Sequence, residues 1–230
     1  MFPSLNLIRL CVAWPLLIWP LISYVQNCPL CGHEWAEAAT PESVQEIFDV
    51  GVSPNGLSKF NSPLLFLLAM KSSDARIAEA FVAEATSRNV ELKLIVMHDL
   101  GYVESTVLHY AARNDSSAML EYFLELGADP HLRDGRDKTP LAVAPGYTEN
   151  VDVYLALLEA GVDPNAADAL GWTVLHGAAR FSKNPEIFRI LVNHGGSIDT
   201  KTDNGLTPII IAERHRQPEI AELLESLGAK

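Results

Sequence analysis

The chain has 230 residues, of which 48% are hydrophobic and 20% are charged. This composition is typical of a folded protein with a packed core and excludes a disordered chain. The formal net charge of −12, from 29 acidic and 17 basic residues, argues against a nucleic-acid-binding or anionic-membrane-binding surface, because both ligands attract lysine and arginine.

The first 33 residues differ in composition from the rest and are predicted to be a signal peptide or a membrane anchor. Residues 10–25 (LCVAWPLLIWPLISYV) are almost wholly apolar. A helix of this length reaches about 24 Å, short of the roughly 30 Å of a hydrocarbon layer. Length therefore favours a signal peptide, whereas the distant AEA at 36–38 is a poor cleavage site and favours an uncleaved anchor. An apolar helix that only caps the folded part is the third interpretation.

The charges on either side of the apolar segment predict its orientation. Arg9 is the only lysine or arginine before Lys59, whereas Glu34, Glu37 and further acidic residues follow the segment. Basic flanks stay on the cytoplasmic side of a membrane. We therefore expect the body of the chain outside the cytoplasm, in the periplasm if the protein is bacterial; the alternative is a cytoplasmic protein.

Two cysteines follow the apolar segment in the stretch CPLCGH. Cys28 and Cys31 have the spacing of a metal-binding pair, with His33 close by. A closed zinc site needs four ligands, and the sequence has no second pair. We expect a disulfide or free thiols and no metal or cofactor, with zinc binding and lipidation at Cys28 as alternatives.

A motif of 33–34 residues repeats along the second half of the chain. Each copy opens with a threonine and closes with a glycine. The threonines are Thr106, Thr139, Thr173 and Thr207, and the glycines are Gly127, Gly161, Gly195 and Gly228. Because two independent markers keep one period, the pattern predicts a repeat architecture.

Each repeat is predicted to contain two helices. The threonine caps the first helix, and a following proline, as at Thr139-Pro140, occupies the first helical position without loss of a hydrogen bond. The second helix carries an apolar stripe, as at Tyr154, Leu157 and Leu158, and the glycine ends it. A unit this small cannot bury its own stripe and must stack on its neighbours. Tight turns between units are marked by Asp134-Gly135, Asp168 before Gly171, and Asp203 before Gly205.

These residues make the chain resemble an ankyrin-repeat protein. The matching stretches are TVLHYAA at 106, TPLAVA at 139, TVLHGAA at 173 and TPIIIA at 207, with unit ends GADPH, GVDPN and GGSID. The resemblance implies an all-α solenoid of stacked helix-turn-helix units with short hairpin turns. It places regular repeats at 99–230, and it implies that His109 and His176 form hydrogen bonds within and between units.

Residues 34–98 are predicted to form an N-terminal cap and an irregular unit. EIFDVGVSPN at 46–55 resembles the second half of a unit, and SPLLFLLA at 62–69 resembles a first helix. The distance from Ser62 to Thr106 is 44 residues, and no glycine closes a unit near position 84. The additional residues include VELKLIV at 90–96, whose alternation suggests a strand or an edge segment. The segment is either an inserted functional loop or part of an irregular cap.

No motif in the chain requires an enzyme. The sequence lacks the glycine-flanked nucleophile of a hydrolase and the phosphate-binding GxxxxGK[ST], and GHEW at 32–35 lacks the second histidine of a zinc protease. We therefore expect a non-enzymatic protein without a small-molecule substrate. The resemblance implies instead that the turn tips and first helices bind a protein partner on the concave side.

The predicted partner-binding residues are rich in arginine and aromatic side chains, which are enriched at interface hot spots. Each of them alone is also compatible with an ordinary solvated residue. Together they form a cationic and aromatic strip on an acidic chain, which favours an acidic protein surface as the partner. The predicted set is Arg113, Arg136, Tyr147, Leu170, Trp172, Arg180, Phe181, Leu206, Arg214 and His215.

Two hypotheses for the biological role follow from the export signal and the repeats. By analogy with exported ankyrin-repeat proteins, the first is an immunity or accessory protein that neutralises a secreted toxin. The second is an envelope scaffold or stress-related factor that supports a neighbouring enzyme.

Overall fold

A computed structural model of the chain describes residues 36–49, 53, 64–87, 95–96 and 105–229. The chain divides into two compact units, Met1–Leu94 and Ile95–Lys230, which are described separately. The predicted N-terminal apolar helix and the Cys28–Cys31 pair lie outside the described residues. Among the helices that are described, none is both long enough and apolar enough to span a membrane.

In the first unit, the described helices are α3 (Pro41–Asp49), α4 (Leu64–Lys71) and α5 (Ala75–Ser87). Helix α5 packs against both α3 and α4. The rings of Phe48 and Phe81 meet edge to face, with centroids 4.9 Å apart. Helix α5 continues through position 84, which agrees with the missing glycine at that point.

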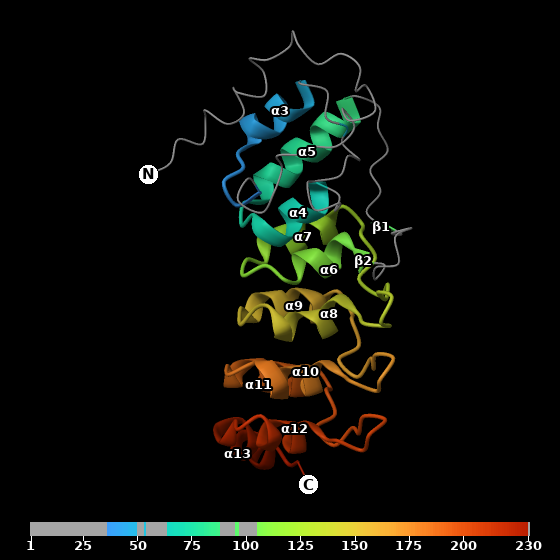
Figure 1. The fold of residues 1–230 in the computed structure, drawn as a ribbon, viewed down its shortest axis with the longest axis vertical. Coiled ribbons are helices and arrows are strands. Elements are labelled where there is room, and N and C mark those ends of the chain that lie inside the picture. The colour runs from blue at the N-terminus through green and yellow to red at the C-terminus, as the bar shows by residue number, and fades with distance from the viewer. Residues whose placement is uncertain (1–35, 50–52, 54–63, 88–94, 97–104, 230) are drawn as a thin grey trace, which may run out of the picture. The chain divides into compact units, whose positions relative to one another are not determined.

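The second unit is a stack of four helix pairs (Figure 1). The first helices of the pairs contact one another in chain order, and the second helices form a parallel row of their own. The predicted all-α repeat solenoid is therefore confirmed. The pairs are α6 (Val107–Ala111) with α7 (Ala118–Glu125), α8 (Pro140–Val143) with α9 (Val151–Glu159), α10 (Val174–Phe181) with α11 (Pro185–Asn193), and α12 (Pro208–Arg214) with α13 (Pro218–Ser226); a short 3-10 helix η2 (Ala144–Gly146) extends α8.

The termini of these helices follow the sequence markers. The hydroxyl of Thr139 accepts a hydrogen bond from the backbone N–H of Ala142 at 3.2 Å, as a helix cap does. Thr207 also stands at the start of a helix, but its hydroxyl is buried without a hydrogen-bond partner among the described residues. The predicted hydroxyl cap is therefore wrong at this one threonine. The closing glycines all have positive φ, at 84° for Gly127, 85° for Gly161, 88° for Gly195 and 105° for Gly228.

The apolar stripes of the second helices form the core between repeats. Tyr154 and Leu157 of α9 are fully buried, as are their counterparts Phe188 and Leu191 of α11. Burial of a leucine side chain contributes about 1.5–3 kcal/mol relative to exposure. The Tyr154 hydroxyl donates to the carbonyl oxygen of Thr148 at 3.0 Å, so the one polar atom that this ring buries is satisfied.

A short sheet precedes the first complete helix pair. Strand β1 (Ile95–Val96) pairs antiparallel with β2 (Ser105–Thr106), and Ile95 lies opposite Thr106. Within the predicted strand at 90–96, the described residues 95–96 are indeed in β1; the others lie outside the described residues.

Side-chain amides connect consecutive repeats. The amide nitrogen of Asn184, which caps α11, donates to the carbonyl oxygen of Glu149 in the preceding repeat at 3.1 Å. Asn150 makes the same bond to Asp115 at 2.8 Å. Because the bond recurs at the same place in two successive junctions, it fixes one repeat on the next in a constant register.

Candidate functional site: a groove between the hairpins and the first helices

A tight hairpin at Asp134 forms the first wall of the site. The carboxylate of Asp134 accepts hydrogen bonds from the backbone N–H groups of Arg136 at 2.8 Å and Lys138 at 2.9 Å. Asp137, at the tip, has a φ of 64°, a left-handed conformation that glycine adopts more easily. The turn predicted at Asp134-Gly135 is present, but its left-handed residue is Asp137 and not Gly135.

The next hairpin repeats this geometry 34 residues further on. The carboxylate of Asp168 accepts hydrogen bonds from the N–H groups of Leu170 and Trp172, each at 2.9 Å. The left-handed position is Gly171, with a φ of 75°. In the following hairpin the equivalent acceptor is the hydroxyl of Thr202, at 3.2 Å from the N–H of Leu206. Asp203, which the sequence pattern marked, therefore does not hold that turn.

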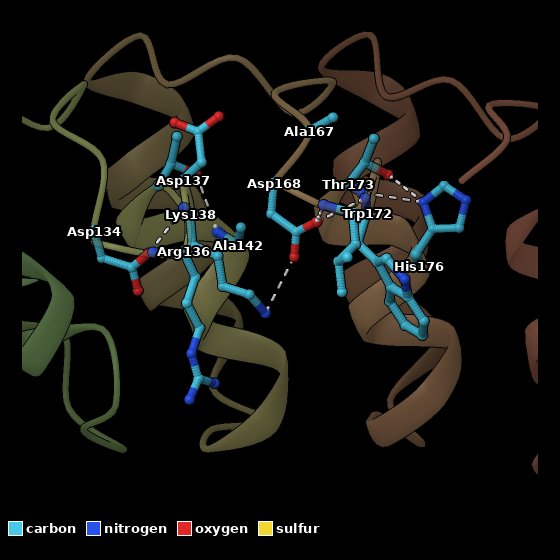
Figure 2. A network of polar contacts seen from close by, with 12 residues as sticks. Asp134, Arg136, Asp137, Lys138, Ala142, Ala167, Asp168, Trp172, Thr173 and His176 are labelled. Atoms are coloured by element: carbon cyan, nitrogen blue, oxygen red, sulfur yellow. Dashed lines mark hydrogen bonds and ion pairs between the residues drawn. The ribbon is translucent and has the colours of Figure 1, made fainter. Parts of the chain in front are cut away.

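Hydrogen bonds join neighbouring hairpins into a continuous row. The N–H of Ala169 donates to the carbonyl oxygen of Arg136 at 3.1 Å, and the N–H of Asp203 donates to that of Leu170 at 3.2 Å. Figure 2 shows the ammonium group of Lys138 extended toward Asp168. The two groups are 3.6 Å apart, and the Asp168 side chain is only 6% exposed. The wall of hairpins is thus tied together from one repeat to the next.

Two buried histidines connect the hairpins to the first helices. Nδ1 of His176 accepts the backbone N–H of Thr173 at 3.1 Å, and its Nε2 faces the carbonyl oxygens of Thr200 and Leu206 at 3.0 and 3.1 Å. This arrangement fits a neutral ring with its proton on Nε2. Burial lowers the pKa of His176 and of His109, which favours the neutral form. The hydrogen bonds within and between units that the resemblance implied are therefore present.

A groove of about 870 Å³ lies between this row of hairpins and the first helices. It runs along two hairpins, α8, η2 and α10, and Arg113 lines one end of it. The exposed apolar side chains Tyr147, Leu170 and Phe181 are 58%, 62% and 53% exposed and all line it. The groove therefore presents aromatic and aliphatic surface to solvent.

The groove is also cationic. Arg113, Arg136 and Arg180 line it, and none of the three forms an ion pair with a carboxylate among the described residues. The carboxylates in the lining, Asp134 and Asp168, already accept the backbone N–H groups of their turns. The lining therefore carries a local excess of positive charge, in contrast to the net charge of −12 of the whole chain.

Aromatic rings hold two of these arginines. The Arg113 guanidinium carbon lies 4.9 Å from the centroid of the Tyr110 ring and 4.8 Å from that of Tyr147. The Arg180 guanidinium carbon lies 4.9 Å from the Phe181 ring centroid and 5.8 Å from that of Trp172. All four distances are within the range of cation–π attraction. The rings thus restrict the positions that each guanidinium can take.

Seven of the ten predicted binding residues line this groove, and three do not. The lining includes Arg113, Arg136, Tyr147, Leu170, Trp172, Arg180 and Phe181. Leu206, Arg214 and His215 belong to the last repeat and lie outside the lining. Lys138, at a turn tip, and Gly146, after a first helix, also line the groove. The repeat pattern placed both on this face, but it indicated neither the ion pair of Lys138 with Asp168 nor the open space at Gly146.

The described residues contain no cluster of three or more histidine, cysteine, aspartate or glutamate side chains that could hold a metal ion. The histidines next to the groove use both ring nitrogens in hydrogen bonds to the backbone. Neither His109 nor His176 therefore has a ring nitrogen free for a ligand.

Comparison with known families agrees with the geometry. A family model described as ankyrin repeats (many copies) matches residues 98–144. A second model, described as ankyrin repeats (3 copies), matches residues 140–230. The comparison with curated proteins gave no match. Since the two family matches together cover residues 98–230, more than half of the chain, the chain belongs to the ankyrin-repeat family.

Proposed function

We propose that this chain is a non-enzymatic binding protein that holds a partner protein in the groove between its hairpins and first helices. Ankyrin repeats are protein–protein interaction modules, which gives the general class of function. The observation that carries the specific proposal is the exposure of Tyr147, Leu170 and Phe181 in a groove with three unpaired arginines. Large exposed apolar side chains beside arginine are typical of interface hot spots.

The chemistry of the lining supports binding over catalysis. A general base needs a free lone pair within reach of a substrate. The Asp134 and Asp168 carboxylates each hold two turn N–H groups on Oδ1, and His176 is buried with both nitrogens engaged. We therefore assign no catalytic residue to the groove.

A partner that buries this groove gains from both kinds of side chain. Apolar burial contributes about 25 cal/mol per Å² of area removed from water. The arginines add charge-assisted hydrogen bonds, which are roughly twice as strong as neutral ones. An acidic partner surface fits best, because the positive potential of the groove attracts it while the acidic remainder of the chain repels misplaced contacts.

We further propose that the apolar segment at 10–25 exports or tethers the chain, so that the groove faces the space outside the cytoplasm. The support is its length, its lack of charge and the single preceding Arg9. In this setting the partner is a secreted toxin, for which the chain acts as an immunity protein; an envelope enzyme supported by a scaffold is the second candidate. A fusion of alkaline phosphatase after Lys230 should be active if the body is exported, and an inactive fusion would place it in the cytoplasm.

Co-purification tests the binding function. The tagged full-length chain is isolated from its native host, and bound proteins are identified by mass spectrometry. The double variant Tyr147→Ala and Trp172→Ala should lose the main partner, because both side chains line the groove. The control Leu126→Ala removes an exposed apolar residue, 41% exposed, that does not line it. Equal capture by the double variant and the control would show that the partner binds elsewhere.

A further inference from the structure

One residue of the groove lining is a glycine, although the backbone conformation at that position does not require glycine. Gly146 stands seven residues after Thr139, where the neighbouring repeats carry Arg113 and Arg180. It ends the short helix η2, and its φ is outside the left-handed region that requires glycine. A Cβ atom placed on Gly146 would meet nothing within 4 Å. The fold therefore tolerates a side chain here, and its absence leaves the middle of the groove open.

The open position lies in the repeat between two arginines that are held ready for a ligand. Arg113 is placed between the rings of Tyr110 and Tyr147, and Arg180 lies near the rings of Phe181 and Trp172. The Nε of Arg113 is buried with no hydrogen-bond partner among the described residues. The part of this guanidinium that lines the groove makes no ion pair among the described residues, so it can bind an incoming carboxylate.

We propose that the groove holds an extended, acidic segment of the partner protein, which passes over Gly146 and places one carboxylate on Arg113 and a second on Arg180. This inference rests on the proposed binding function and specifies the chemistry of its ligand. The occupant is a peptide segment and not a broad surface, because it has to enter the groove and cross the open strip that Gly146 leaves between the two arginines. Carboxylates are the matching groups, since arginine binds them through two parallel N–H···O bonds.

The spacing of the repeats sets the length of the segment. Arg113 and Arg180 belong to the first and third helix pairs, so two spacings between neighbouring pairs separate them. Packed helices are 8–10 Å apart, which puts the two arginines roughly 16–20 Å from each other along the stack. An extended chain advances about 3.3 Å per residue, so the two acidic residues should be roughly five or six positions apart. The residues between them should be small or apolar, to fit beside Tyr147 and over the glycine.

Selection from a random library tests this chemistry without knowledge of the partner. The immobilised full-length chain is used to select from a phage-displayed library of random dodecapeptides. We expect the enriched peptides to contain two aspartate or glutamate residues roughly five or six positions apart. If the wild type enriches peptides without acidic residues and the Tyr147→Ala, Trp172→Ala variant does not, this inference is overturned. The proposed function would still stand, because binding would still depend on the groove. Equal enrichment by that variant would instead contradict the proposed function.

Fluorescence anisotropy with the best selected peptide then measures each contact. Replacement of either peptide carboxylate by its amide should weaken binding at least about tenfold. The variants Arg113→Gln and Arg180→Gln should do the same, whereas Arg189→Gln, an arginine on α11 outside the groove, should leave the dissociation constant unchanged. Since the amide peptides leave the protein untouched, their result does not depend on how the arginine variants fold. Unchanged affinity for both amide peptides overturns the proposal.

A pair of substitutions tests the path over Gly146. Gly146→Leu adds a side chain into open space, so the melting temperature should not fall, but peptide affinity should drop at least about tenfold as the strip is blocked. Gly146→Ala should bind almost as the wild type does. Full affinity of the leucine variant for the peptide overturns the proposed path over Gly146.

Light scattering tests whether a second copy of this chain occupies the groove instead. An increase in molecular mass with protein concentration that Arg180→Gln removes would assign the groove to self-association and overturn the assignment to a partner.

Discussion

His109 Nε2 lies 2.9 Å from the carbonyl oxygen of Lys138, a residue of the next repeat. The other ring nitrogen accepts the backbone N–H of Thr106 at 3.2 Å. One neutral ring therefore satisfies a helix start and a hairpin of the following unit at once. The stack and the groove wall depend on the same side chain, so stability and partner binding are linked through it.

Removal of either histidine should destabilise the stack. His109→Ala and His176→Ala each leave buried backbone groups without partners, and we expect a loss of about 1–3 kcal/mol in the free energy of unfolding for each. Urea denaturation followed by circular dichroism measures this loss. His131→Ala, at an exposed position in the loop after α7, is the control and should change stability by less than about 0.5 kcal/mol.

These histidines also predict a pH dependence. Burial lowers the pKa of both rings below the ordinary value of 6.5. The unfolded chain therefore takes up protons at a higher pH than the folded chain does, so this contribution to stability is complete above pH 6.5 and is lost as the pH falls below it. Between pH 7.5 and 5.5, the wild type should lose more stability than the double variant His109→Ala, His176→Ala. Parallel losses in the two proteins would contradict neutral buried rings.

The core between repeats should be sensitive to cavity formation. Leu157 of α9 is fully buried, so Leu157→Ala should cost about 2–5 kcal/mol of unfolding free energy. Leu170 is 62% exposed, and Leu170→Ala should change stability by less than about 0.5 kcal/mol. A melting curve for Leu157→Ala that overlays that of Leu170→Ala would be incompatible with the stacked arrangement.

The close approach of neighbouring hairpins can be measured with two glycines. Gly171 and Gly205 have φ of 75° and 73°, so an alanine at either position costs about 1–2 kcal/mol of backbone strain. A Cβ at Gly171 would also lie 2.8 Å from the backbone nitrogen of Asp203, whereas one at Gly205 would meet nothing within 4 Å. Gly171→Ala should therefore be the more damaging by about 1–3 kcal/mol. Equal losses would mean that the hairpins are not in contact.

Much of the fold could be predicted because every repeat carries the same sequence markers for helix starts, helix ends and buried faces. The opening threonines, the closing glycines and the apolar stripes recur at one period, and each has a local structural cause. The exception is Thr207, whose hydroxyl makes no hydrogen bond among the described residues although the same local pattern surrounds it.

The candidate groove could be predicted only in part. Equivalent repeat positions brought Arg113, Tyr147, Arg180 and four further residues to one face, because the stack keeps a constant register. The placement of the Arg113 guanidinium between two rings depends on side-chain conformation, which period and composition do not determine. The predicted binding residues also included Leu206, Arg214 and His215 of the last repeat, which do not line the groove.

The central claim is that this groove, and not another face of the stack, holds the partner protein. Site-specific photo-crosslinking in the native host tests it most directly, with the photoreactive residue placed either at Tyr147 in the groove or at Leu126, an exposed apolar residue outside it. We predict a covalent adduct with one protein partner from position 147 and none from position 126. Adducts with the same protein from position 126 alone, or equally from both positions, would contradict the assignment.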